Sequence, residues 1–83
     1  MPRINDSLSW SIHGHAKDNN GPEHKPHVHI TCSDGSSMTV DIERAYILDG
    51  GLDNRKKQEE ALQWVSANYS MLMGVWNNSV VDN

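Results

Sequence analysis

The sequence has no phenylalanine, only one cysteine and no long apolar run, and each shortage excludes a class of structure. A single cysteine cannot form a disulfide within the chain. No apolar stretch approaches the roughly 20 residues that a membrane-spanning helix requires. Nothing near Met1 has the charged and then apolar layout of a signal peptide. We therefore expect a cytoplasmic protein that makes no contact with a membrane.

Basic residues are also scarce. Seven Lys and Arg stand against eleven Asp and Glu, which gives a formal net charge of -4. Unspecific binding to phosphates depends on many cationic contacts, so this balance argues against a nucleic-acid partner. A chain of this length buries only about 60% of the surface that it exposes when unfolded. We expect added support from a protein partner, a metal or homo-oligomerisation.

Three stretches alternate apolar and polar residues with the period of two that is typical of half-buried β-strands. They begin near Leu8, His27 and Met38, and Ala45–Leu48 is expected to add a short fourth strand before a turn at Asp49–Gly51. The polar cluster between Ala16 and Pro26 predicts a loop. The residues expected to form one apolar face are Leu8, Trp10 and Ile12; Val28, Ile30 and Cys32; and Met38, Val40 and Ile42.

The spacing of the second and third strands suggests a register. If Cys32 stands across from Met38, the apolar faces of the two strands become continuous. The same register sets His29 opposite Asp41 and His27 opposite Glu43.

The C-terminal third predicts helix. Asp53 or Asn54 can cap the start of a helix, and apolar residues then recur at spacings of three and four up to Trp76. One long helix and two helices joined near Tyr69 are both compatible with this pattern. We predict a single α+β domain over residues 1–83: an antiparallel sheet of three to four strands over residues 8–48, with one face covered by a helical layer over residues 53–79.

Histidines are expected to gather on the other, solvated face of this sheet. If the first two strands pair, the imidazoles of His13, His15, His27 and His29 share that face, with Asp41 and Glu43 beside them. Imidazole is a common ligand of zinc and nickel, so these four histidines are a candidate metal site. His27 and His29 are also candidate catalytic residues, because one imidazole can withdraw a proton from an RNA 2′-hydroxyl while the other protonates the leaving oxygen.

A third interpretation is a non-catalytic binding surface. It would consist of half-exposed polar side chains on the wet face, namely Lys25, His27, His29, Asp41 and Glu43. Cross-strand pairs of histidine and carboxylate would add a few tenths of a kcal/mol each. The sequence alone does not decide between the three interpretations.

Five stretches of the chain form a recognisable combination: Glu23–Ile30, Asp41–Glu43, Gly50–Leu52, Ala61–Val65 and Leu72–Trp76. Together they resemble the small bacterial family called domain of unknown function 4160. The resemblance runs from about Ser11 to Asn77, and Lys25 stands where the family usually has a second proline. It implies a strand-rich half followed by helices, with His27 and His29 as the residues carried over and Trp64 and Trp76 as structural positions. It also implies genes beside a small partner, in a toxin–antitoxin-like arrangement.

These observations favour a small protein-binding component of a two-gene, toxin–antitoxin-like module. The histidine-lined sheet face would be its working surface. Two alternatives stay open: a ribonuclease toxin that uses His27 and His29, and a phage-type inhibitor that blocks a host defence complex in the manner of an anti-CRISPR protein. An enzyme, if this is one, would be a ribonuclease or a metal-dependent hydrolase.

Overall fold

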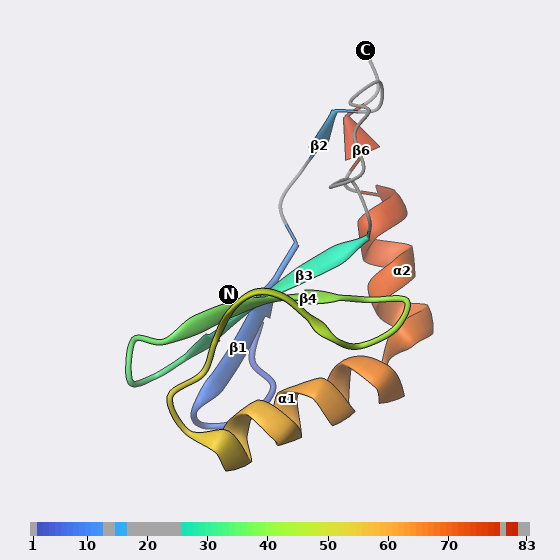
Figure 1. The fold of residues 1–83 in the computed structure, drawn as a ribbon. Helices are drawn as coiled ribbons and strands as arrows, with labels where there is room; N and C mark the ends of the chain where they lie inside the picture. Colours follow the sequence, from blue (N-terminus) through green and yellow to red (C-terminus); the bar gives the residue numbers. More distant parts are fainter. Residues whose placement is uncertain (1, 13–14, 17–25, 79, 82–83) are drawn as a thin grey trace.

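The fold is built on a four-stranded antiparallel sheet in the order β1-β3-β4-β5 (Figure 1). The structure, a computed structural model, describes residues 2–12, 15–16, 26–78 and 80–81, and only the backbone of 15–16 and 80–81. The strands of this sheet are β1 (Leu8–Ser11), β3 (His27–Cys32), β4 (Ser37–Asp41) and β5 (Ile47–Gly51). A separate two-stranded parallel sheet pairs β2 (His15–Ala16) with β6 (Val80–Val81).

Two helices follow the sheet, as one of the two predicted arrangements requires. Helix α1 (Arg55–Ala67) begins at Asn54, whose side-chain oxygen accepts from the Lys57 amide at 3.1 Å. It ends at Asn68, whose side-chain amide and backbone N–H both donate to the Trp64 carbonyl, each at 2.9 Å. Helix α2 (Tyr69–Asn78) starts immediately afterwards. Asn68 thus stops one helix and allows the chain to turn into the next.

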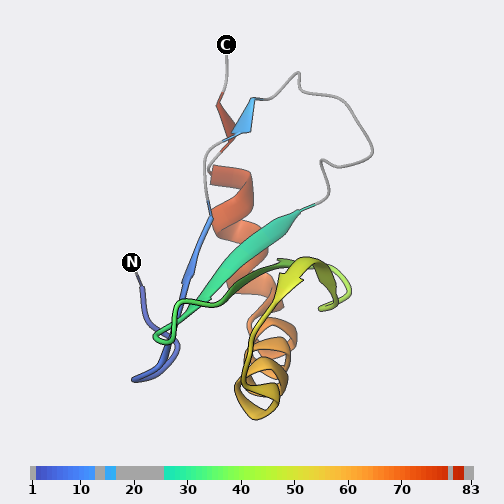
Figure 2. The same cartoon turned by 60° about the vertical axis from the view of Figure 1, so that its left-hand side comes forward.

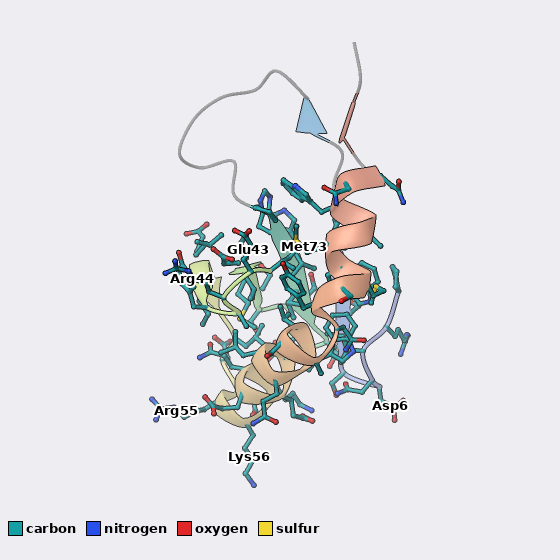
Figure 3. The ribbon with its side chains drawn as sticks, turned by 90° about the vertical axis from the view of Figure 1, so that its right-hand side faces the viewer. Asp6, Glu43, Arg44, Arg55, Lys56 and Met73 are labelled. Carbon is teal, nitrogen blue, oxygen red and sulfur yellow. The ribbon has the colours of Figure 1, made fainter. Side chains whose placement is uncertain are left out.

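The core lies between the sheet and the two helices. Figure 2 shows the strands in front of α2, so that the helical layer lies behind the sheet. Ala61 and Val65 of α1 and Leu72 of α2 are fully buried, and Trp64 stacks at an angle on Trp10, with ring centroids 5.7 Å apart. Met73 points from α2 toward the sheet (Figure 3). The apolar residues predicted from the alternation to be buried include Leu8, Val28, Ile30, Cys32, Met38, Val40 and Ile42, and all seven are buried. Asp41, which was expected to be half-exposed on the solvated face, is buried as well, because the turn after β4 folds back onto its carboxylate.

The register between β3 and β4 differs from the predicted one by two residues. Ile30 stands opposite Met38, and Val28 stands opposite Val40. The cause is a tight turn, in which the Cys32 N–H donates to the Ser36 carbonyl at 2.8 Å, so Cys32 faces Ser36 rather than Met38. A shift of two residues keeps every side chain on its predicted face and changes only the partners across the strands.

Asp34 holds this turn in place. Its carboxylate accepts from the hydroxyl and the backbone amide of Ser36, and these hydrogen bonds lower the pKa of Asp34. Gly35 has a positive φ of 96°, a conformation that glycine adopts without strain. The turn therefore needs fewer residues than the prediction allowed.

The fourth strand begins and ends later than predicted. Residues 41–46 form a turn in which Ala45 has a φ of 54° and its N–H donates to the Asp41 carbonyl at 2.7 Å. Strand β5 therefore starts at Ile47 and includes Asp49–Gly51, which were expected to turn. Near the end of the described chain, Val80 and Val81 pair with β2.

Candidate functional site

The candidate site is the sheet surface that faces away from the helices. We call it the polar face, and it consists of Ser9, Ser11, His27, His29, Thr31, Ser37, Thr39 and Asp49. Period-two alternation places these side chains opposite the buried apolar ones. Apart from the contact of His27 with Trp76 of α2, no helix of the described part of the chain covers this surface (Figure 2).

Two rows of polar residues cross the polar face at right angles to the strands. The pairings Ser11–His29, His29–Thr39 and Thr39–Asp49 form one continuous row. Neighbouring strands lie about 4.8 Å apart, so the polar side chains of this row are spaced about 4.8 Å from one strand to the next. The second row, one side-chain layer further along, joins Ser9, Thr31, Ser37 and Gly51.

A shallow hollow follows the first row. Its volume is about 300 Å³, and His29 and Thr39 are among the residues that line it. Hydroxyl groups can each donate and accept, so the lining suits a ligand with alternating donors and acceptors. The lining residues are Ser11, His29, Thr31, Ser37, Met38, Thr39, Asp49 and Gly50.

His29 is oriented by its neighbour on β4. The Thr39 hydroxyl lies 3.3 Å from His29 Nδ1, and the tautomer of the ring decides which of the two donates. The imidazole is half-buried, so Thr39 orients the ring while part of the ring stays exposed to solvent. Cross-strand pairing therefore fixes the ring that lies nearest the centre of the polar face.

His27 lies at the end of the polar face nearest α2. Its ring meets the Trp76 ring edge-on, with centroids 4.8 Å apart, and meets the His29 ring at 5.3 Å. Trp76 is a buried residue of α2, so His27 touches both the core and the polar face. No local sequence pattern indicates this contact, because α2 is remote from His27 along the chain.

Asp41, and not Glu43, stands across from His27. The Ile42 N–H donates to the Pro26 carbonyl at 3.0 Å, so the next pair, His27 and Asp41, is a non-hydrogen-bonded one with its side chains close together. The Asp41 side chain is only 2% exposed, and its Oδ1 accepts from the Arg44 amide at 3.1 Å. This carboxylate therefore stabilises the turn after β4. The other partner expected for a histidine, Glu43, is exposed on that turn.

The four-histidine arrangement is only partly visible. His13, His24 and Lys25 lie outside the described residues, and His15 is described only by its backbone, which pairs with Val80 instead of β3. In the described part of the chain, no group of three or more His, Cys, Asp or Glu side chains is arranged to hold a metal ion. The metal site therefore stays a prediction.

Sequence reasoning missed several residues of the site. Four hydroxyl side chains line the hollow together with His29, namely those of Ser11, Thr31, Ser37 and Thr39. The alternation along each strand did place these four residues on the polar face. The recurrence of Ser or Thr at alternate positions could have identified them as part of the site. Thr39 as the partner of His29 could have been found from the short turn that Asp34 and Gly35 favour.

Of the three comparisons with known proteins, one found a match. The family model for domain of unknown function 4160 (DUF4160) matches residues 12–77, most of the chain, so the protein belongs to this family. No curated protein and no solved structure is significantly similar to the chain. No helix among the described residues is both long and apolar enough to cross a membrane.

Proposed function

We propose that this protein is the binding component of a two-gene, toxin–antitoxin-like module and that it contacts its protein partner through the polar face. The observation that carries the proposal is the position of both helices on one side of the sheet, which leaves the polar face of the described chain open apart from the contact of His27 with Trp76. A sheet face with a fixed row of hydroxyl, imidazole and carboxylate groups offers specific hydrogen bonds to a partner.

The charge of the polar face favours protein over nucleic acid. No residue of this face, as defined above from the described strands, is a lysine or arginine, while Asp49 adds an exposed carboxylate. Nucleic-acid binding depends on cationic contacts to phosphates. A partner rich in backbone amides or in basic side chains would match the polar face better.

The proposal can be tested with matched surface variants of the full chain. Immobilised wild-type protein should retain one stoichiometric partner from a lysate of its native host. Thr39→Arg places a long charged side chain in the middle of the hollow and should abolish retention. Gln63→Arg makes a similar change at an exposed position of α1, on the other side of the molecule, and should retain the partner.

Two results would contradict the proposal. Retention by Thr39→Arg at the wild-type level would show that the polar face is not the contact surface, and the absence of any stoichiometric partner would remove the binding function. Circular dichroism of both variants checks that the fold is intact. The identity of the retained protein separates a cognate partner from a component of a host defence complex.

A ribonuclease is the second candidate, because the rings of His27 and His29 lie 5.3 Å apart at one end of an open face. One could act as base and the other as acid, with Asp41 across from His27. This function predicts RNA cleavage with a bell-shaped pH profile that His29→Ala abolishes. Unchanged cleavage by His29→Ala, or no cleavage by the wild type, would exclude it.

A further inference from the structure

The outer surface of α2 carries no charge. Although 22% of the residues in the sequence are charged, no Asp, Glu, Lys or Arg occurs between Glu60 and Asp82. We call the exposed residues of this helix away from Tyr69 the α2 outer face. They are Ser70, Met71, Gly74, Asn77 and Asn78.

These residues form one continuous strip. At 3.6 residues per turn, successive side chains are about 100° apart, so the five positions fall within about 120° of the helix circumference. Gly74 lies near the middle of the strip. Leu72 and Trp76, which are buried, lie on the opposite side of the helix. The strip is therefore a single surface that faces away from the core.

Gly74 has no role in packing within the described chain. A Cβ atom added there would meet nothing within 4 Å, whereas one added at Gly50 would lie 2.7 Å from the Ser37 carbonyl oxygen. Glycine is the poorest helix former after proline, so its place in the middle of α2 opposes helix formation. A close approach by a second chain is a physical reason for a glycine at this point.

We propose that a second copy of this chain packs on the α2 outer face, with the two Gly74 residues close to a two-fold axis. The chain has a net charge of -4, so two copies repel each other at most orientations. The α2 outer face is a surface on which they meet without bringing carboxylates together. In a two-fold interface the same patch serves both sides. Asn77 and Asn78 suit this requirement, because each amide can both donate and accept.

The two-fold packing leaves the polar face free. The α2 outer face and the polar face have no residue in common, and Figure 3 shows the charged Arg55 and Lys56 at the start of α1, away from α2. A ten-residue helix offers a small contact area, so the dimer should form reversibly and depend on protein concentration. The inference does not depend on the proposed function, because the dimer forms without the other partner.

Sedimentation velocity of the purified full chain over about three decades of concentration tests this. The wild type should shift from the mass of one chain to that of two. Gly74→Arg introduces a charge at the proposed axis and should weaken self-association at least about tenfold. Ser33→Arg makes the same charge change in the exposed β3–β4 turn, remote from α2, and should dimerise like the wild type.

A wild-type protein that keeps the mass of one chain at every concentration would overturn the proposal. Dimerisation of Gly74→Arg at the wild-type level would also overturn it. If Gly74→Arg failed to fold, Gly74→Ala would decide the matter, since a methyl group at the axis should still weaken dimerisation while the helix becomes more stable. Self-association of Gly74→Ala at the wild-type level would count against the proposal.

Discussion

Single residues in the β3–β4 turn decide which groups meet on the polar face. Asp34 accepts two hydrogen bonds from Ser36 and thereby closes the turn after Cys32. In the register that the alternation alone suggested, Cys32 would pair with Met38 and Asp41 would stand across from His29. The chemistry of the candidate site thus depends on a carboxylate that lies outside it.

Asp34 should contribute to stability only while it is ionised. Hydrogen bonds from Ser36 lower its pKa from the ordinary 3.8, so its contribution is present above that value and is lost as pH falls through the folded-state pKa. Asp34→Asn keeps an oxygen acceptor but cannot titrate. We expect the free energy of unfolding of Asp34→Asn to fall less than that of the wild type on acidification below about pH 4.

Urea unfolding at neutral and at acid pH measures this difference. Asp53→Asn is the matched control, because Asp53 is likewise an exposed carboxylate. An acid-induced loss of stability that is equal in Asp34→Asn and wild type would contradict the role given to Asp34.

At the scale of elements, the β4–β5 hairpin depends on Gly50. This residue has a φ of 74° and lies beside the Ser37 carbonyl, and the register shifts between Thr39 and Val40 to accommodate the strand. The pairing of Thr39 with Asp49 completes the first row of the polar face. A change that separates the two strands would therefore remove part of the hollow.

Alanine substitutions at Gly50 and Gly74 should have opposite effects. Gly50→Ala combines a positive φ with a steric clash, and we expect it to lower the free energy of unfolding by at least about 2 kcal/mol. Gly74→Ala should raise it by about 1 kcal/mol, because alanine favours a helix and the added methyl meets no atom of the described chain.

Denaturant unfolding at one low protein concentration compares the two variants without a contribution from self-association. If Gly74→Ala were less stable than the wild type, the added methyl group would have to clash with other atoms, contrary to the open surroundings described for Gly74. A neutral Gly50→Ala would show that β5 can move away from Ser37 without loss.

At the scale of the whole molecule, stability depends on a small core. Leu72 is fully buried and links α2 to the sheet residues and to Val65 of α1. Leu72→Ala should lower the free energy of unfolding by about 2–5 kcal/mol, through lost burial and a residual cavity. For a domain of this size each 1 kcal/mol corresponds to a Tm decrease of about 4–8 °C.

Thermal unfolding followed by circular dichroism measures this effect. Gln63→Ala, at an exposed position of α1, should change stability by less than about 0.5 kcal/mol. A Leu72→Ala protein as stable as Gln63→Ala would mean that α2 contributes little to the core.

The sequence alone was sufficient to predict the faces of the strands and the start of α1. Leu8, Val28 and Val40 are buried as the alternation requires, because the two sides of a strand differ in solvent exposure whatever its partner is. Asn54 caps α1 for a similarly local reason, since a cap needs only its own side chain and the first turn.

Only the tertiary structure decided which residues meet. The alternation is unchanged by a two-residue shift, so the pairing of His29 with Thr39 rather than Asp41 was set by hydrogen bonds in a turn. The contact of His27 with Trp76 joins residues far apart in the chain, and no local pattern encodes it. Position along one strand is a local property, whereas contact between elements depends on how the whole core packs.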